Sequence, residues 1–262
     1  MASAPRPVVT FLTDFGAGSG YPAQMKGVVL RALPDATLVD LSHEVPPFDV
    51  LAGALLLEAC VPRFPAQAVH VAVVDPGVGT PRRPLCVVDG EGRRLVGPDN
   101  GLFTPFLGPR SRAVLIATPG VVPEPATATF HGRDLFAPVG AWLAGGGRPE
   151  ALGPAVEDPV RLPWPSAERV GQEIRGAGLV VDSFGNLVTS IRAGDLEGAR
   201  VAEVEAGGRH LPLVRTFGDV PRGEAAALVG SWGRLEVVVR EGHAARSLSL
   251  ARGSPVVVKL AG

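Results

Sequence analysis

The first half of the chain alternates two hydrophobic patterns. Short apolar runs rich in β-branched residues predict strands at residues 8–13, 36–41, 69–74, 85–88, 94–96 and 113–117. Between them, apolar positions at helical spacing predict helices at residues 21–33, 49–60 and 134–143. Strands that alternate with helices indicate an α/β domain built on a mostly parallel sheet. We expect this domain to span residues 1–155.

The pattern changes in the second half. A stretch without periodicity is punctuated by Pro154, Pro159, Pro163 and Pro165, which predicts a proline-rich linker at residues 156–166. Beyond it no helix is expected, and short runs predict strands at residues 174–181, 187–191, 200–204, 209–214, 225–229, 234–239 and 255–260. Residues 167–262 should therefore form a small all-β, barrel-like domain.

Composition narrows the class of protein. Hydrophobic residues make up 46% of the 262 residues and charged residues 19%, which excludes a disordered chain. The net charge of −1 provides no global field for nucleic acid or anionic lipid. The longest apolar run, near residues 50–57, is too short to span a bilayer, and no signal peptide precedes the first strand. We expect a cytoplasmic protein in which Cys60 and Cys86 are reduced thiols.

Two predicted strands end in a carboxylate, Asp14 and Asp75. Ligands of open α/β sheets bind beyond the carboxyl ends of the strands, although aspartates there also cap turns. Asp75 opens the tight loop Asp75-Pro76-Gly77-Val78-Gly79-Thr80, which Arg82 follows closely. The loop could expose amides to a phosphate, but its spacing matches neither common phosphate-binding motif.

Other polar residues have both a structural and a functional interpretation. His131 precedes the third predicted helix, where a lone histidine is more often structural than catalytic. Asp182-Ser183-Phe184-Gly185-Asn186 and Gly230-Ser231-Trp232-Gly233 are typical of hairpin turns, yet Asn186 could pair with an adenine-like edge and Phe184 could stack on a ring. No His/Cys spacing typical of a metal site and no serine-hydrolase elbow occurs.

Several of these segments, taken in order, resemble one family. They are Thr13-Asp14-Phe15-Gly16, Met25-Lys26-Gly27, Asp40-Leu41-Ser42-His43, Pro47-Phe48-Asp49, Val73-Val74-Asp75-Pro76-Gly77-Val78-Gly79-Thr80, Pro98-Asp99-Asn100-Gly101, Thr129-Phe130-His131-Gly132-Arg133-Asp134 and Asp182-Ser183-Phe184-Gly185-Asn186. The chain resembles the S-adenosyl-L-methionine (SAM) hydroxide adenosyltransferases, or SAM hydrolases, which are related to the bacterial fluorinase and chlorinase. The resemblance implies an α/β domain, a β-barrel-like domain, a homotrimer, and a SAM site between domains of neighbouring subunits.

The resemblance also assigns roles. The family's catalytic Asp–Arg–His set falls on Asp75, Arg82 and His131. It implies hydrolysis of SAM to adenosine and L-methionine, with SAM as the substrate and no cofactor or metal. On this interpretation Arg82 polarises a water molecule, and Asp75 and His131 accept its proton.

Seven further positions are implied to bind the substrate. Asp14 corresponds to the carboxylate that holds the ribose diol, Phe48 to an aromatic beside the ribose, and Phe130 lies in the motif of His131. In the second half, Asp182 corresponds to the group that binds the methionine ammonium. Phe184 and Asn186 correspond to adenine contacts, and Ser231 to a contact with the methionine carboxylate. The halogenating relatives carry Arg at position 232, where this chain has Trp232.

Three alternatives stay open. The fluorinase has Tyr, Thr and Ser where this chain has Asp75, Val78 and Gly132, and a carboxylate at position 75 disfavours an anionic nucleophile such as halide. A SAM- or adenosine-binding protein without turnover would not need the Asp–Arg–His set. A metal-dependent phosphohydrolase could use Asp14, Asp75 and His131.

Overall fold

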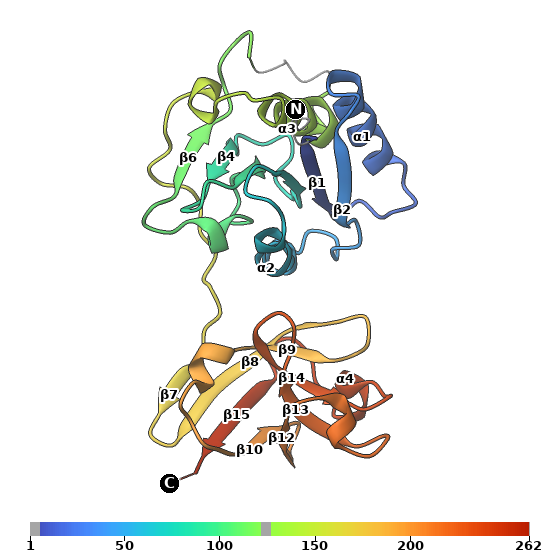
Figure 1. The fold of residues 1–262 in the computed structure, drawn as a ribbon, viewed down its shortest axis with the longest axis vertical. Coiled ribbons are helices and arrows are strands. Elements are labelled where there is room, and N and C mark those ends of the chain that lie inside the picture. Colours follow the sequence, from blue (N-terminus) through green and yellow to red (C-terminus); the bar gives the residue numbers. More distant parts are fainter. Residues whose placement is uncertain (1–5, 122–126, 262) are drawn as a thin grey trace, which may run out of the picture. The chain divides into compact units, whose positions relative to one another are not determined.

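The computed structural model describes residues 6–121 and 127–261 and divides the chain into two compact units, Met1–Pro163 and Trp164–Gly262 (Figure 1). The division lies within the predicted linker. The part of that linker before Pro163 is bonded to the first unit, because the amide of Val160 donates to Asp99 Oδ1 at 2.8 Å and that of Leu162 to Thr104 Oγ1 at 2.9 Å.

The first unit confirms the predicted α/β class. Its strands are β1 (Val8–Thr13), β2 (Thr37–Ser42), β3 (Val69–Val73), β4 (Pro84–Val88), β5 (Arg94–Pro98) and β6 (Arg112–Leu115). They form one sheet in the order β2-β1-β3-β5-β4-β6, in which β2, β1, β3 and β5 are parallel and β4 is antiparallel to both of its neighbours. The parallel strands place several carboxyl ends at one edge of the sheet.

Helices cover both faces of this sheet (Figure 1). They are α1 (Tyr21–Ala32), α2 (Val50–Cys60) and α3 (Ala137–Ala144). Helices α1 and α3 pack against each other and share a core with the β1 residues Val9 and Phe11. The next residue of β1, Leu12, faces the other way toward Gly53 of α2, as the two-residue repeat of a strand requires. Asp49 caps α2, its carboxylate accepting from the amide of Ala52 at 3.0 Å.

The second unit is a barrel-like sheet, as predicted. Its strands are β7 (Glu168–Val170), β8 (Glu173–Val181), β9 (Leu187–Arg192), β10 (Val201–Ala206), β11 (Arg209–Leu211), β12 (Leu213–Val214), β13 (Ala225–Val229), β14 (Arg234–Val239) and β15 (Pro255–Leu260). The order is β11-β10-β15-β8-β9-β14-β13-β12, with β7 beside β8. Alternate residues of the strands, such as Leu235 and Val237, fill its core.

In this unit the strand β7 was not predicted, and two further segments differ from the sequence prediction. The strand expected at residues 209–214 is divided at Pro212, which has no N–H to donate, and β12 pairs with β13 in parallel. The expectation of no helix was wrong, because Ala244–Ser247 form α4, capped by His243 Nδ1, which accepts from the Arg246 amide at 3.3 Å. A single turn produces no hydrophobic periodicity that a sequence pattern could reveal.

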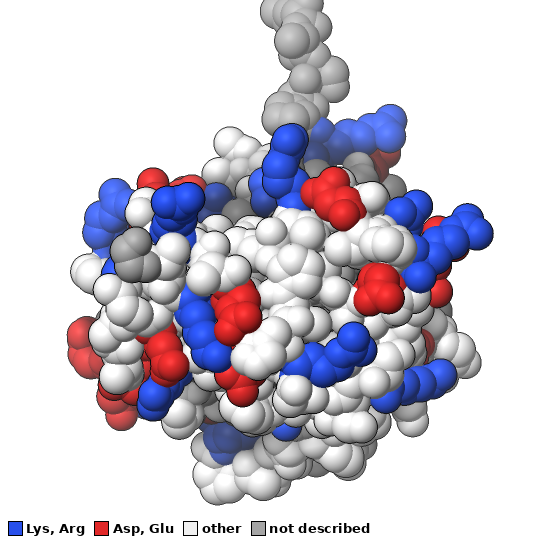
Figure 2. Space-filling model, turned by 90° about the horizontal axis from the view of Figure 1, so that it is seen from below, with Lys and Arg blue, Asp and Glu red and all other residues white. Residues whose placement is uncertain are grey.

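Acidic and basic side chains lie interspersed across a largely uncharged surface on the face drawn in Figure 2. Mixed signs of this kind agree with the net charge of −1. Within the described ranges, no helix combines the length and the apolar character needed to cross a membrane.

Candidate active site

Asp75 follows β3, a strand that is buried along its whole length. The loop after it folds into tight turns. The amide of Val78 donates to the carbonyl of Asp75 at 3.3 Å, and the amide of Thr80 donates to the carbonyl of Gly77 at 3.1 Å. The amide of Gly77 also donates to Asp75 Oδ1 at 3.2 Å. Gly79 has a φ of 78°, in the left-handed region that glycine adopts without strain. The loop turns the chain back so that Arg82 reaches the carboxylate.

The guanidinium of Arg82 holds both oxygens of Asp75. Its Nε lies 3.1 Å from Oδ1 and 3.0 Å from Oδ2, and its Nη2 donates to Oδ2 as well. Only 4% of the Asp75 side chain and 9% of the Arg82 side chain are exposed. A planar guanidinium matches a carboxylate in this way and fixes its orientation more closely than a point charge does.

His131 completes a three-residue cluster. It directly precedes a π-helical turn, Gly132–Phe136, that leads into α3. Arg82 Nη2 lies 2.7 Å from His131 Nδ1, and because arginine has no acceptor, Nδ1 must accept this hydrogen bond. Burial, and after it the Arg82 charge, lower the pKa of His131. The imidazole is therefore neutral near pH 7, with its proton on Nε2.

A small cavity adjoins the cluster. Its volume is about 40 Å³, and its wall includes Asp75, His131, Val78, Phe130 and Gly132. A cavity needs only about 10–15 Å³ of such volume to hold one water molecule. The arrangement therefore combines a buried carboxylate, a cation that orients it, and room for water beside both the carboxylate and the imidazole.

Aromatic rings gather near this cavity. Phe130 meets Tyr21 edge to face at 5.1 Å between ring centroids and Phe15 at 5.7 Å. Asp14, at the end of β1, holds the backbone amide of Phe48 at 2.8 Å through Oδ2. Phe48 has a φ of 66° and is 68% exposed, an uncommon combination for a large apolar side chain. The sequence-predicted residues Asp14 and Phe48 therefore form one local structure.

The predicted residues of the second unit form another group, built around Asp182. Its Oδ1 accepts from the amides of Phe184 at 2.9 Å and Asn186 at 2.8 Å, and its Oδ2 from the Asn186 side-chain amide at 3.0 Å. The turn between β8 and β9 is thus folded around one carboxylate. It buries Asn186 but leaves Phe184 76% exposed.

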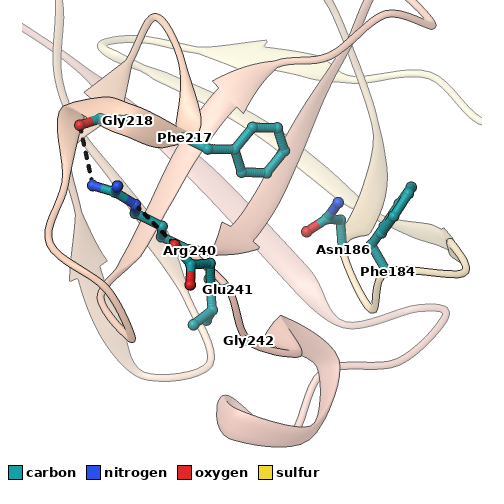
Figure 3. A pocket seen from close by; sticks show the side chains of 8 residues that line it. Phe184, Asn186, Phe217, Gly218, Arg240, Glu241 and Gly242 are labelled. Atoms are coloured by element: carbon teal, nitrogen blue, oxygen red, sulfur yellow. Dashed lines mark hydrogen bonds and ion pairs between the residues drawn. The ribbon is translucent and has the colours of Figure 1, made fainter.

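Two cavities flank this turn. The larger, about 610 Å³, is lined by Phe184, Asn186 and residues from two other segments, among them Phe217 and Arg240. Figure 3 shows the Phe217 ring directed toward Asn186 and Phe184 across the opening. The guanidinium of Arg240 points away from these aromatic rings, because its Nη1 donates to the carbonyls of Val220, at 2.8 Å, and Gly218, at 3.4 Å (Figure 3). Aromatic rings and an amide offer stacking and edge pairing to a flat base.

The second cavity, about 360 Å³, lies on the Asp182 side of the turn and is also lined by Ser231, Trp232 and Glu236. Ser231 and Trp232 stand at the tip of the turn between β13 and β14. Glu236 lies in β14 between Leu228 of β13 and Val188 of β9, both apolar. Burial, and then the Asp182 charge, raise the pKa of Glu236 to about 7.

The sequence predictions missed Tyr21, Phe217 and Glu236 as site residues. Tyr21 begins a helix and Phe217 lies in a short 3-10 turn, and no motif of the sequence marks either residue. A detectable signal did exist for Glu236, the single acidic residue in the strand Arg-Leu-Glu-Val-Val-Val of β14. Within residues 6–121 and 127–261, no three His, Cys, Asp or Glu side chains are grouped so that they could hold a metal ion.

Comparison with known families places the whole chain among proteins of one kind. The family model described as SAM hydroxide adenosyltransferase N-terminal domain matches residues 9–153, and its C-terminal counterpart matches residues 176–257. Proteins named (R)-S-adenosyl-L-methionine hydrolase are similar in Thermus thermophilus, with 45% identity over 96% of this chain and 98% of the relative, and in Salinispora tropica, with 43% identity over 95% and 97%. A fluorinase of Nocardia brasiliensis is 29% identical over 97% of each chain.

Solved structures share the whole architecture. An uncharacterized conserved protein of Thermotoga maritima superposes with a TM-score of 0.88 at 31% identity, covering 96% of this chain and 99% of its own. A conserved hypothetical protein of Thermus thermophilus gives a TM-score of 0.77 at 43% identity, covering 98% and 100%. The resemblance first noticed in the motifs is thereby confirmed, and the chain belongs to the SAM hydroxide adenosyltransferase family.

Proposed function

We propose that this protein hydrolyses SAM to adenosine and L-methionine by attack of water on C5′ of the ribose. The observation that carries the proposal is the bonded set Asp75–Arg82–His131 beside a cavity of water size. Relatives at 42–45% identity are named (R)-S-adenosyl-L-methionine hydrolases. We therefore propose the (R) epimer at sulfur as the preferred substrate.

The chemistry requires an activated nucleophile but no general acid. Methionine leaves the sulfonium as a neutral thioether, so the C5′–S electron pair returns to sulfur without protonation. Water, with a pKa of about 15.7, is a poor nucleophile until its proton has an acceptor. As the C5′–O bond forms, the oxygen becomes a strong acid, and a carboxylate in contact with it takes the proton.

The cluster geometry divides the work among the three side chains. Asp75 is the proton acceptor, and Arg82 fixes both of its oxygens. Because Arg82 occupies His131 Nδ1, the imidazole offers its Nε2–H, which orients the water as a hydrogen-bond donor. The expectation from the sequence was that His131 shares the proton with Asp75. We propose instead that His131 orients the attacking water and that Asp75 alone takes its proton. Water held in line with C5′ and sulfur gains from proximity.

Isotope incorporation tests the reaction directly. Incubation with each sulfonium epimer of SAM in ¹⁸O-water should place the label on the 5′-oxygen of adenosine, with the (R) epimer consumed faster. Adenosine without label, or no release of methionine, would contradict hydroxide transfer. We further propose that neither metal nor cofactor is needed, so a chelator should leave the rate unchanged. Chelator-sensitive turnover would instead favour the phosphohydrolase class.

Halide transfer is the competing reaction. The carboxylate of Asp75 disfavours an anion in the water-sized cavity, and the fluorinases are more distant relatives than the hydrolases. We expect no halogenated nucleoside when chloride or fluoride is added at high concentration. Its formation at a rate similar to that of adenosine would overturn the preference for water.

We also propose a homotrimer with its SAM sites between neighbouring subunits, in the cytoplasm. The two groups of site residues belong to different units, and each presents an exposed ring, Phe48 or Phe184. Asp75→Asn protein mixed with Asn186→Ala protein should regain activity once subunits exchange. No rescue, with exchange shown by mass, would place the site within one subunit. Free thiols at Cys60 and Cys86 support the proposed location.

A further inference from the structure

Two of the segments that resemble the family contribute no residue to either group of site residues. They are Met25-Lys26-Gly27, in α1, and Asp40-Leu41-Ser42-His43, at the end of β2. His43 is only 6% exposed, although it follows the strand at the edge of the sheet. Because a buried imidazole needs polar partners, the contacts of His43 indicate what these two segments do.

Four polar side chains join these segments to the end of β1. Lys26 Nζ lies 2.6 Å from Asp40 Oδ2, and the other oxygen of Asp40 lies 3.0 Å from His43 Nε2. His43 Nδ1 lies 2.9 Å from the hydroxyl of Thr13, which is fully buried. This polar row of Lys26, Asp40, His43 and Thr13 thus runs from a partly exposed ion pair to a buried hydroxyl.

The carboxylate of Asp40 sets the direction of the hydrogen bonds in the polar row. A carboxylate has no proton to donate, so it favours the imidazole tautomer of His43 with the proton on Nε2. Nδ1 then accepts from the hydroxyl of Thr13, and the same hydroxyl oxygen accepts from the amide of Phe15 at 3.2 Å. The hydroxyl is therefore held in one orientation, with its hydrogen toward the imidazole and a lone pair toward the amide.

Asp14 stands at the centre of the turn that this hydroxyl closes. The bond from the Phe15 amide to Thr13 Oγ1 spans the backbone of Asp14, as in other turns closed by threonine. The segment after β2 supports the same turn, because the amide of Gly16 donates to the carbonyl of His43 at 2.8 Å. The ring of Phe15 lines the water-sized cavity of the first unit. One buried hydroxyl thus fixes both the turn of Asp14 and a wall of that cavity.

We infer that the polar row positions Asp14, fixing its carboxylate so that both hydroxyls of the ribose can donate to it. The four side chains act through the turn rather than on the reacting atoms. A binding group must be held within about 0.5 Å of its productive geometry. Bonds that exist before the ligand arrives hold the carboxylate there and reduce the entropy lost on binding. The inference rests on the proposed function, in which SAM is the substrate and adenosine a product.

The nucleoside product serves as the probe of this positioning. Calorimetry on the full-length protein gives Kd for adenosine and for 2′-deoxyadenosine, and adenosine release gives kcat and KM for SAM. We expect the wild type to bind adenosine about tenfold more tightly than the deoxynucleoside, which leaves one lone-pair site of Asp14 unpaired. This preference is measured without turnover, so it separates the inference from the proposed function.

Two substitutions at Thr13 distinguish the hydroxyl from the packing of the side chain. Thr13→Val keeps the shape but removes the hydroxyl. In this variant the preference for adenosine should fall to about twofold or less, with KM for SAM raised more than kcat is lowered. Thr13→Ser keeps the hydroxyl and should keep the preference.

Asp40→Asn tests the polar row at its partly exposed end. The amide oxygen is attracted to Lys26, which leaves the NH2 group facing His43 and favours the tautomer with the proton on Nδ1. The Thr13 hydroxyl then turns away from the imidazole, and the preference for adenosine should fall to about threefold. Nitrogen NMR of the His43 ring should show its proton on Nε2 in the wild type and on Nδ1 in the variant.

The second unit offers a matched control. Glu203 also lies between a lysine and a histidine, with Lys259 at 3.1 Å and His210 at 2.9 Å. Glu203→Gln therefore removes a carboxylate with the same two kinds of partner, and it should change neither the preference for adenosine nor KM for SAM.

Each outcome bears on one of the two claims. A preference for adenosine that survives in Thr13→Val and in Asp40→Asn, or that is lost equally in Thr13→Val and Thr13→Ser, would overturn the positioning role. Equal binding of the two nucleosides by the wild type would overturn it as well. If Thr13→Val does not fold, Asp40→Asn still decides. If the preference follows the hydroxyl but SAM is not hydrolysed, the proposed function fails while the positioning role stands.

Discussion

The two groups of site residues differ in how completely they are bonded without a ligand. In the first unit, the Asp75 carboxylate has its counterion in Arg82, and Arg82 also holds His131. In the second unit, Asp182 is satisfied by its own turn while Glu236 lies in the wall of a cavity of about 360 Å³. The first group is thus organised before the substrate arrives, as transition-state stabilisation requires. The second leaves the Glu236 carboxyl facing its cavity without a cation among the described residues that line it.

The largest effect is expected at the organised cluster. Asp75→Asn keeps the shape of the carboxylate but removes its charge and its ability to take a proton. We expect kcat to fall by roughly 10²–10⁴, with Kd for SAM nearly unchanged. Asp89→Asn is the control, since Asp89 is also buried and paired with an arginine, Arg93, at 3.0 Å, but lies in a hairpin turn. Similar losses in both variants would show that the effect arises from folding.

Arg82→Lys tests whether the geometry of the cluster matters beyond its charge. A lysine keeps the charge but cannot hold two carboxylate oxygens and an imidazole in one plane. We expect kcat to fall by about 10–100-fold, most of it from misplaced groups. Arg83→Lys is the neighbouring control, because Arg83 forks between Asp99 and Asp158 and faces no site residue. An Arg82→Lys enzyme with wild-type kcat would contradict an organising role for the guanidinium.

Sequence patterns predicted the first group of residues better than the second. Asp75 and Asp14 could be recognised as site candidates because each follows a buried, predicted strand. The carboxyl ends of parallel strands meet at one edge of the sheet, where ligands bind. The sequence signal at Glu236, one acidic residue in an apolar strand, is ambiguous, because such a residue usually faces solvent. Its burial depends on its register partners Leu228 and Val188, which are 8 and 48 residues away in the chain. Pairing across strands is not visible in a local pattern.

The predicted fold shows the same limit. The strands β4 and β5 and the helix α2 lie close to their predicted ranges, and the hairpin and the cap that fix them involve residues near in the chain. The division of a predicted strand at Pro212 and the one-turn helix α4 depend on what each segment packs against, so both differ from expectation.

The two units should also respond to pH with opposite sign. His70 in β3 is fully buried, and burial, followed by the Arg93 charge, lowers its pKa to about 4, with Asp89 opposing. The unfolded chain then binds a proton between pH 6.5 and 4 that the folded unit does not, so stability falls as pH falls through this window. For Glu236, whose pKa is raised to about 7 by burial and Asp182, stability falls as pH rises from 4.5 to 7. Each of these two groups changes the free energy of unfolding by at most about 3 kcal/mol across its window.

Hydrogen exchange resolved by segment measures both trends in one protein. From pH 5 to pH 7, amides of β3 should become better protected, after correction for intrinsic rates, and amides of β14 less protected. His70→Gln should abolish the first trend alone and Glu236→Gln the second alone. Parallel changes in both strands would show that one global transition dominates and that the units do not differ in this way.

The smallest effect concerns the ribose and is expected at Asp14. Its carboxylate binds the Phe48 amide through Oδ2 at 2.8 Å and retains lone pairs for a cis-diol. A 2′-deoxy analogue of SAM leaves one such site unpaired, so we expect kcat/KM to drop by about tenfold or more. In Asp14→Ala this discrimination should vanish, while Phe48→Ala, which keeps the carboxylate, should preserve it. If Asp14 only holds the Phe48 loop, Asp14→Ala would lower stability and leave the ratio of the two substrates unchanged. Measuring both substrates on the wild type and on both variants distinguishes reading of the diol from support of the loop.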